Sequence, residues 1–155
     1  MLVGILSGHT EEPVNLVNAP AMAEDRGIDL VERKESASED FTELVTVRLG
    51  DAEVAGTGVG PRNIPYLVGV WGQSFYMPFA DHFAVFRYAD QPGMIGRVGN
   101  TFGENGVNIV SAAVGAESGS DEAVMALTTD APVPEGVIEE IAGGDGFAEG
   151  HAIDF

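Results

Sequence analysis

The segment Asp90–Gly93 lies between a predicted strand and a predicted helix, and it carries groups suited to binding a small charged molecule. The N–H groups of the first helical turn, near Met94 and Ile95, have no partner within the helix, and a helix start of this kind attracts a carboxylate. Gly93 has no side chain, so a ligand can come close to the backbone. Asp90 adds a negative charge that suits an ammonium group. Together these groups fit the two charged ends of an α-amino acid.

A second polar residue, Asn108, stands at the start of the next predicted strand. Its amide offers both donors and acceptors, so it can satisfy a zwitterion. Each of these residues also has a structural alternative. Asp90 could simply cap the helix, as aspartate often does. Asn108 could bond its own backbone in a turn.

Other candidate sites carry weaker signals. The glycine-rich stretch 56–61 lacks the spacing of a dinucleotide fingerprint, and Pro61 opposes the helix that must follow one, so it predicts a strand with a bulge or a close turn. His9, His82 and His151 are too widely spaced to indicate a metal site. No carboxylate pair stands out for acid–base catalysis. We therefore expect no catalytic residue, no metal site and no cofactor site in this chain.

Charge and composition exclude several classes of partner. The 155 residues hold 25 Asp and Glu against 7 Lys and Arg, a formal net charge of -18. Nucleic acids and anionic membrane surfaces bind basic proteins, so neither is an expected partner. The chain has no cysteine, no apolar run long enough to span a membrane and no basic start typical of a signal peptide. We expect a cytoplasmic protein.

The second half of the chain predicts an α+β fold with the order strand, helix, strand, strand, helix, strand. This is the ferredoxin-like βαββαβ arrangement, whose helices cover one face of the sheet. The first strand, however, is apolar on both faces, so something else must cover the other face, either a second copy of the domain or the first half of the chain. The predicted strands are 82–88, 107–115, 122–128 and 147–155, and the helices are 94–102 and 134–141.

The first half is less regular. Asn18 is a candidate N-cap for a short helix that ends at Gly27, and Gly50 with Asp51 predicts a hairpin turn. A proline-containing stretch at 76–81 marks a predicted boundary, which gives a small mixed α+β domain at 1–80 and a second domain at 81–155. The strands predicted in the first half are 27–33, 41–49, 53–59 and 66–75.

Two stretches of the second half, Phe86–Gly99 and Phe102–Ile109, resemble the ACT domain that closes bacterial D-3-phosphoglycerate dehydrogenases. Upstream, Val14–Ile28 resembles the start of the intervening, or allosteric substrate-binding, domain of the long form of that enzyme. The stretch Leu2–Gly8 resembles the end of a helix in the same domain. The resemblance covers nearly the whole chain.

The resemblance implies feedback control of serine synthesis by L-serine. Its effector site lies where ACT domains meet, and the matching positions here are Tyr88, Asp90, Asn108 and Gly93 with the helix start. It also implies that ACT domains pair side by side as a homo-oligomer. The family's catalytic Arg, Glu and His and its NAD-binding fold have no counterpart here. The chain is therefore expected to have no catalytic activity by itself and to act with a dehydrogenase catalytic domain that holds the NAD.

Two other readings stay open at this point. One is the regulatory part of an iron–sulfur L-serine dehydratase, which resembles this domain pairing. The other is an assembly module that pairs through its sheet and binds no small molecule.

Overall fold

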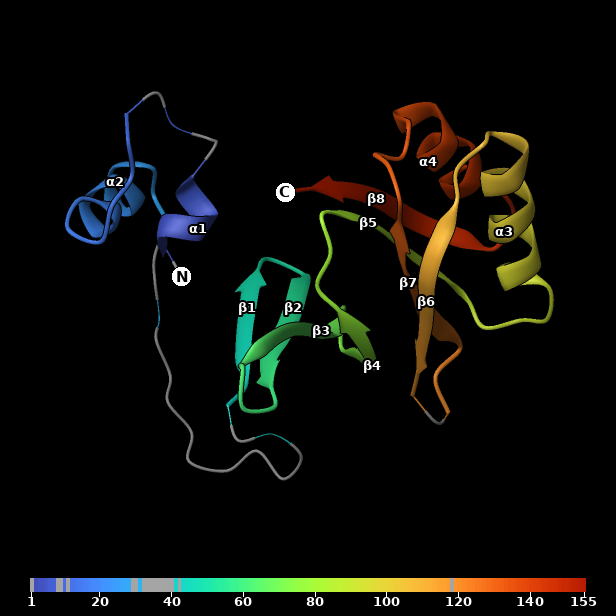
Figure 1. Ribbon diagram of the computed structural model, residues 1–155, viewed down its shortest axis with the longest axis horizontal. Helices are drawn as coiled ribbons and strands as arrows, with labels where there is room; N and C mark the ends of the chain where they lie inside the picture. The colour runs from blue at the N-terminus through green and yellow to red at the C-terminus, as the bar shows by residue number, and fades with distance from the viewer. Residues whose placement is uncertain are drawn as a thin grey trace. The chain divides into compact units, whose positions relative to one another are not determined.

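The computed structural model describes residues 2–7, 10, 12–28, 31, 41, 43–117 and 119–155. The chain divides into two compact units, Met1–Ala37 and Ser38–Phe155, and each is described by itself. Figure 1 labels the helices and strands along the chain. Most of the predicted strand 27–33 and the candidate residue His9 lie outside the described residues.

The first unit holds α1 (Leu2–Leu6) and α2 (Ala19–Asp25). Leu6 packs with Ala19 and Ala23 in a small core. The predicted helix after Asn18 is confirmed, but the Asn18 side chain does not cap it. Instead, its Oδ1 accepts a hydrogen bond from the Asn15 N–H at 2.7 Å, so the side chain turns back toward the preceding loop.

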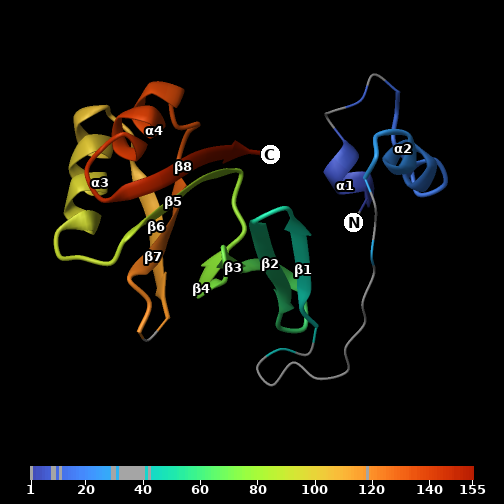
Figure 2. The same ribbon diagram turned by 180° about the vertical axis from the view of Figure 1, so that it is seen from behind.

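The C-terminal sheet has the predicted ferredoxin-like topology. Its strand order is β6-β7-β5-β8, with antiparallel pairing throughout. The two helices that belong to it, α3 and α4, lie on one side of the sheet (Figure 2). The α+β fold class is thereby confirmed. The elements are β5 (His82–Ala89), α3 (Met94–Glu104), β6 (Ile109–Ala116), β7 (Glu122–Thr129), α4 (Glu135–Ala142) and β8 (Phe147–Asp154).

The core between the helices and this sheet is built on fully buried aromatic and aliphatic side chains. Phe86 of β5 and Phe102 of α3 meet edge to face with ring centroids 6.2 Å apart. Gly150 of β8 lies under the Phe86 ring, where a Cβ would stand 2.6 Å from Phe86 Cδ1. The absence of a side chain at Gly150 therefore leaves room for the Phe86 ring beside β8.

The opposite face of the sheet is covered by the chain's own β3–β4 hairpin. Leu67, Phe75 and Met77 of this hairpin pack against Phe83 and Val85 of β5 in a second core. The sequence analysis left two possible covers for this face, a second copy of the domain or the first half of the chain. In the structure, residues from the first half of the chain cover it. The edge strand β6 also approaches β4 closely, because a Cβ on Gly115 of β6 would lie 2.6 Å from the Ser74 carbonyl oxygen of β4.

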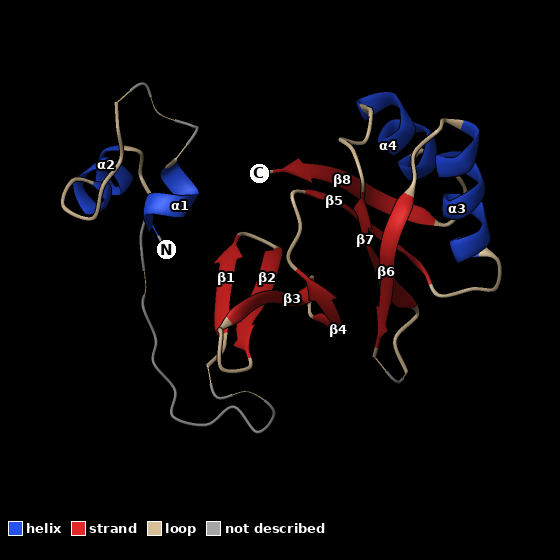
Figure 3. Cartoon of the chain, in the orientation of Figure 1, coloured by secondary structure: helices blue, strands red, loops and turns tan. Residues whose placement is uncertain are grey.

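The covering hairpin belongs to a four-stranded antiparallel sheet of order β1-β2-β3-β4 (Figure 3). The turn predicted at Gly50 and Asp51 is confirmed, since β1 ends at Leu49 and β2 begins at Ala52. The single strand predicted over 66–75 is wrong, because Trp71 and Gly72 form a turn within it. The strands are β1 (Val45–Leu49), β2 (Ala52–Val59), β3 (Ile64–Val70) and β4 (Gln73–Pro78).

The boundary predicted near residue 80 falls in the short connection between β4 and β5. The compact units instead divide between Ala37 and Ser38, so the sheet β1–β4 belongs with the C-terminal unit. The domain limits 1–80 and 81–155 stay a prediction.

Replacing Met77 with alanine tests the covering hairpin. Met77 of β4 is fully buried in the second core, together with Phe83 and Val85 of β5. We expect Met77→Ala to lower the free energy of unfolding by about 2–5 kcal/mol, because it leaves a cavity in this core. The matched control is Ser74→Ala on the exposed face of β4, with an expected change within about 0.5 kcal/mol. Urea unfolding measures both, and equal effects would contradict the covering role.

Candidate functional site

The predicted junction between strand and helix is present where β5 meets α3. The strand ends at Ala89, and Gly93 is the residue directly before the helix, with φ +97°. No side chain caps α3 at this position, so the alternative in which Asp90 serves as the helix cap does not apply. The first helical hydrogen bond runs from the Arg97 N–H to the Gly93 carbonyl at 3.0 Å. The N–H groups of Met94 and Ile95 therefore stay free of intrahelical partners.

A pocket of about 250 Å³ opens at this junction. Its lining combines the loop 90–93 and the first turn of α3 with one residue of the neighbouring edge strand, Val114 of β6. Five of the six residues expected at the site line it, namely Tyr88, Asp90, Gly93, Met94 and Ile95. Gln91, Pro92, Gly96 and Val114 complete the lining. Gln91 lies inside the predicted segment 90–93 but was not named as a site residue, and Val114 was not predicted, since neither residue type indicates chemistry by itself.

The pocket is lined by the buried phenol of Tyr88 and by the exposed carboxylate of Asp90. Tyr88 is 3% exposed, and its ring packs against Phe147 with centroids 5.8 Å apart. Burial, and secondarily the negative charge of Asp90, raises the pKa of the Tyr88 phenol above its ordinary value. Asp90 is exposed, and in the described part of the chain its carboxylate has neither a hydrogen-bond partner nor an ion-pair partner. The backbone N–H of Asp90 is held by the Asp121 carbonyl at 2.9 Å, which fixes the loop.

The pocket therefore presents two opposite electrostatic ends and an apolar wall. A helix start carries partial positive charge from its free N–H groups and from the aligned peptide dipoles. The Asp90 carboxylate supplies the negative end. Ile95 is 61% exposed and Val114 is 42% exposed, so both offer apolar surface at the pocket's open side. This arrangement can hold a small zwitterion.

Asn108 does not lie in this pocket. It precedes β6, whose other end carries Val114, so the length of the strand separates Asn108 from the pocket. Its Nδ2 donates to Asp130 Oδ2 at 3.3 Å, and its carbonyl accepts from the Asp130 N–H. Within one chain, the structure does not bring Asn108 to Asp90.

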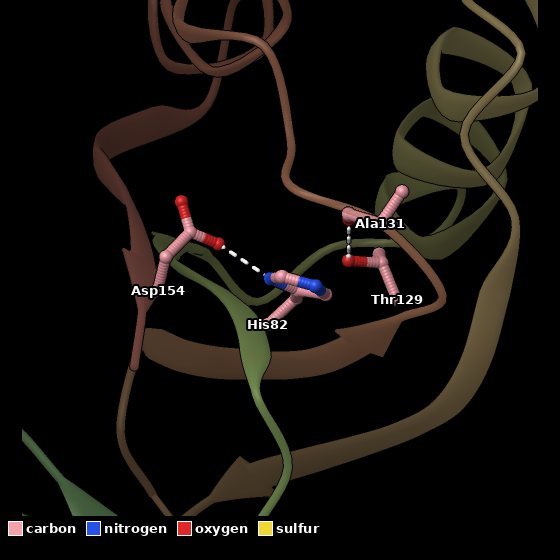
Figure 4. A network of polar contacts seen from close by, with 4 residues as sticks. All are labelled: His82, Thr129, Ala131 and Asp154. Atoms are coloured by element: carbon pink, nitrogen blue, oxygen red, sulfur yellow. Dashed lines mark hydrogen bonds and ion pairs between the residues drawn. The ribbon is translucent and has the colours of Figure 1, made fainter.

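The two described histidines each contact a carboxylate, and neither lines the pocket. His82, at the start of β5, has its Nδ1 2.8 Å from Asp154 Oδ1 (Figure 4). The nearby Thr129 hydroxyl donates to the Ala131 carbonyl, so it is already engaged. His151 contacts Glu149 at 3.3 Å. His82 and Asp154 lie 72 residues apart along the chain, so local spacing could not indicate their contact. His151 and Glu149 lie two residues apart on β8, a spacing that places both side chains on one face of the strand.

The other candidates of the sequence analysis have structural roles. Gly56 and Gly58 lie within β2, with a register shift between Ala55 and Gly56, so the predicted strand with a bulge is confirmed. Among the described residues, no group of His, Cys, Asp and Glu could hold a metal ion. Likewise, none of the described helices is long and apolar enough to cross a bilayer.

Comparison with known proteins adds two family matches. The model of the ACT domain matches residues 82–143, and that of the D-3-phosphoglycerate dehydrogenase intervening domain matches residues 1–64. The first match contains the β5–α3 junction and Asn108.

Several curated relatives align with most of the chain. The D-3-phosphoglycerate dehydrogenase of Methanocaldococcus jannaschii is 36% identical over 141 residues, which is 90% of this chain and 27% of the relative. That of Mycobacterium leprae is 34% identical over 86% of this chain and 26% of the relative. That of Synechocystis is 31% identical over 97% of this chain and 28% of the relative.

The chain spans 26–28% of the length of these relatives. The two domain matches and the aligned relatives point to the same enzyme family. The chain belongs to the intervening-domain and ACT-domain regulatory region of the D-3-phosphoglycerate dehydrogenases.

Proposed function

We propose that this chain is the regulatory region of a D-3-phosphoglycerate dehydrogenase and binds L-serine, or another small α-amino acid, as a feedback effector. The observation that carries the proposal is the unpartnered Asp90 carboxylate beside the free N–H groups of α3 in a pocket of about 250 Å³. The names of the relatives support the enzyme class. The dehydrogenase reaction and its NAD belong to a catalytic domain outside this chain.

In the proposed complex, the ligand lies across the mouth of the pocket. Its ammonium group pairs with Asp90, and its carboxylate accepts hydrogen bonds from the N–H groups of Met94 and Ile95. The buried Tyr88 ring forms the inner wall. The side chain of the ligand points to the open side near Ile95 and Val114.

The second part of the proposal is that β6 pairs with β6 of a second copy. β6 is an edge strand of its sheet, and an edge with exposed apolar side chains is a template for pairing. Val110 is 64% exposed and Val114 is 42% exposed on this strand, and Ile95 of α3 is 61% exposed beside the pocket. These side chains would be buried together in a two-fold interface, where the same surface is used by both copies.

Such pairing also explains how Asn108 can serve the site. Two copies of β6 related by a two-fold axis near the middle of the strand run antiparallel. The start of one strand then lies beside the end of the other, so Asn108 of the partner subunit approaches the end that carries Val114 and the pocket. The amide can donate to and accept from a zwitterion across the interface. A ligand bound by both copies stabilises the paired state, which is the state that would slow the dehydrogenase.

Calorimetric titration with L-serine tests the ligand. We expect binding heat from the unmodified chain and at least a roughly tenfold weaker affinity for Asp90→Asn, because a hydrogen-bonded ion pair contributes about 1.5–3 kcal/mol. Asn108→Ala should weaken binding in the same direction. Asp51→Asn removes the same charge in the β1–β2 turn and should leave affinity unchanged. No heat from the unmodified chain would defeat the proposed effector.

Sedimentation velocity tests the pairing. We expect Val110→Lys to shift a dimer to monomer, because a lysine at this exposed apolar position of β6 must be buried in the interface or must separate the strands. The control is Leu49→Lys, which places the same charge at an apolar position of β1 that is 73% exposed, against 64% for Val110. A dimer that forms without ligand, together with flat calorimetry, would favour an assembly module.

The titration of Tyr88 tests the electrostatics. Since burial is the larger cause and Asp90 the smaller, Asp90→Asn should lower the Tyr88 pKa but leave it above the ordinary 10.0. Well below pH 10.0, the Tyr88 phenol is neutral in both the folded and the unfolded chain. As pH rises above 10.0, the unfolded chain ionises first, so the free energy of unfolding falls until the folded phenol ionises too. Phenolate absorbance, with Tyr88→Phe subtracted, measures the shift, and a Tyr88 pKa below 10.0 contradicts it.

A further inference from the structure

We propose that Gly146, in the connection between α4 and β8, is a positioning residue for the pocket at the β5–α3 junction. Gly146 does not line the pocket, but it packs against Gln91 and Met94, which do. Its missing side chain lets these two residues take the positions that shape the pocket. The inference rests on the proposed function in so far as it concerns effector affinity.

The contact is closer than any side chain would allow. A Cβ on Gly146 would stand 2.4 Å from Gln91 Nε2 and 3.2 Å from the Met94 Cε. Real Cβ atoms do not approach another heavy atom to 2.4 Å, so Gln91 would have to move. Gly146 also has φ +88°, a conformation that glycine adopts without steric cost.

The connection around Gly146 cannot move away to relieve the contact, because it is fixed on several sides. The Gly146 carbonyl accepts a hydrogen bond from the Ala89 N–H at 2.7 Å. The preceding carbonyl, of Asp145, accepts a hydrogen bond from the Arg97 guanidinium of α3. The following residue, Phe147, packs its ring against Tyr88.

Gln91 is the part that can yield. Its Nε2 donates weakly to Met94 Sδ at 3.5 Å, and its side chain ends in freely rotating bonds. A methyl group at position 146 would therefore push the Gln91 amide away from Met94, at the lining of the pocket. Apart from the backbone strain of an alanine at φ +88°, the displaced Gln91 amide costs the folded state little, whereas the shape offered to a ligand would change.

The test compares Gly146→Ala with Gly72→Ala in the full chain. Gly72 has φ +78° in the β3–β4 turn and no heavy atom within 4 Å of an added Cβ, so it carries the same backbone strain without the contact. We expect L-serine affinity to fall by about tenfold or more in Gly146→Ala and to stay within about twofold in Gly72→Ala. The double variant Gln91→Ala with Gly146→Ala should recover the affinity of Gln91→Ala alone, because the clashing group has been removed.

A second readout needs no ligand. Two-dimensional amide NMR spectra should show the Gln91 side-chain amide and the backbone of the loop 90–93 shifted in Gly146→Ala and unshifted in Gly72→Ala. Unchanged Gln91 signals, or shifted signals with unchanged L-serine affinity, would overturn the positioning role. If the unmodified chain binds no L-serine, the proposed function fails, and the Gln91 signals alone then decide whether Gly146 positions the pocket residues.

Discussion

The burial of β5 on both faces is the constraint on which the rest of the structure depends. Phe86 points to the helices and Phe83 and Val85 point to the β3–β4 hairpin, and all three are buried. A one-residue slip of this strand would exchange its two faces, and the two cores have different shapes. The register of β5 is therefore fixed, and with it the positions of Tyr88 and Asp90 at its end.

A fixed strand end explains how an exposed carboxylate can be held beside a helix start. The Ala89 N–H is bound by the Gly146 carbonyl and the Asp90 N–H by the Asp121 carbonyl, so the loop is attached on two sides before α3 begins. The charge of the chain then limits what can bind there. A net charge of -18 and the Asp90 carboxylate disfavour a phosphate ester or a dicarboxylate relative to a ligand without net charge. A zwitterion carries no net charge and can satisfy both ends.

The sequence was sufficient for the βαββαβ order and for most of the pocket, because both follow from local patterns. Apolar spacing marked the helices, and Gly93 before Met94 marked the helix start. The β3–β4 turn was missed because Trp71 has φ +50°, a conformation that large side chains rarely adopt, so that Gly72 at φ +78° was the single local turn signal inside an otherwise apolar stretch.

The contacts that were missed join residues far apart in the chain. Gln91 lies against Gly146, and Val114 lines the same pocket as the loop before α3, because the tertiary fold brings these segments to one place. The cover of the sheet by Leu67 and Met77 is likewise a tertiary outcome. Local spacing contains no information on such pairs, so it could only leave the two possible covers open.

The separation of Asp90 and Asn108 along β6 has a thermodynamic consequence for the proposed pairing. One copy alone offers the ligand Asp90 and the helix start but lacks the amide, which stands at the far end of the strand. A ligand that contacts both copies therefore binds the paired form more tightly than the single one. By linkage, the factor by which pairing strengthens ligand binding equals the factor by which ligand strengthens pairing. If the site is split as proposed, effector concentration would be converted into assembly without any rearrangement inside the domain, since the packed cores on both faces of β5 can stay unchanged.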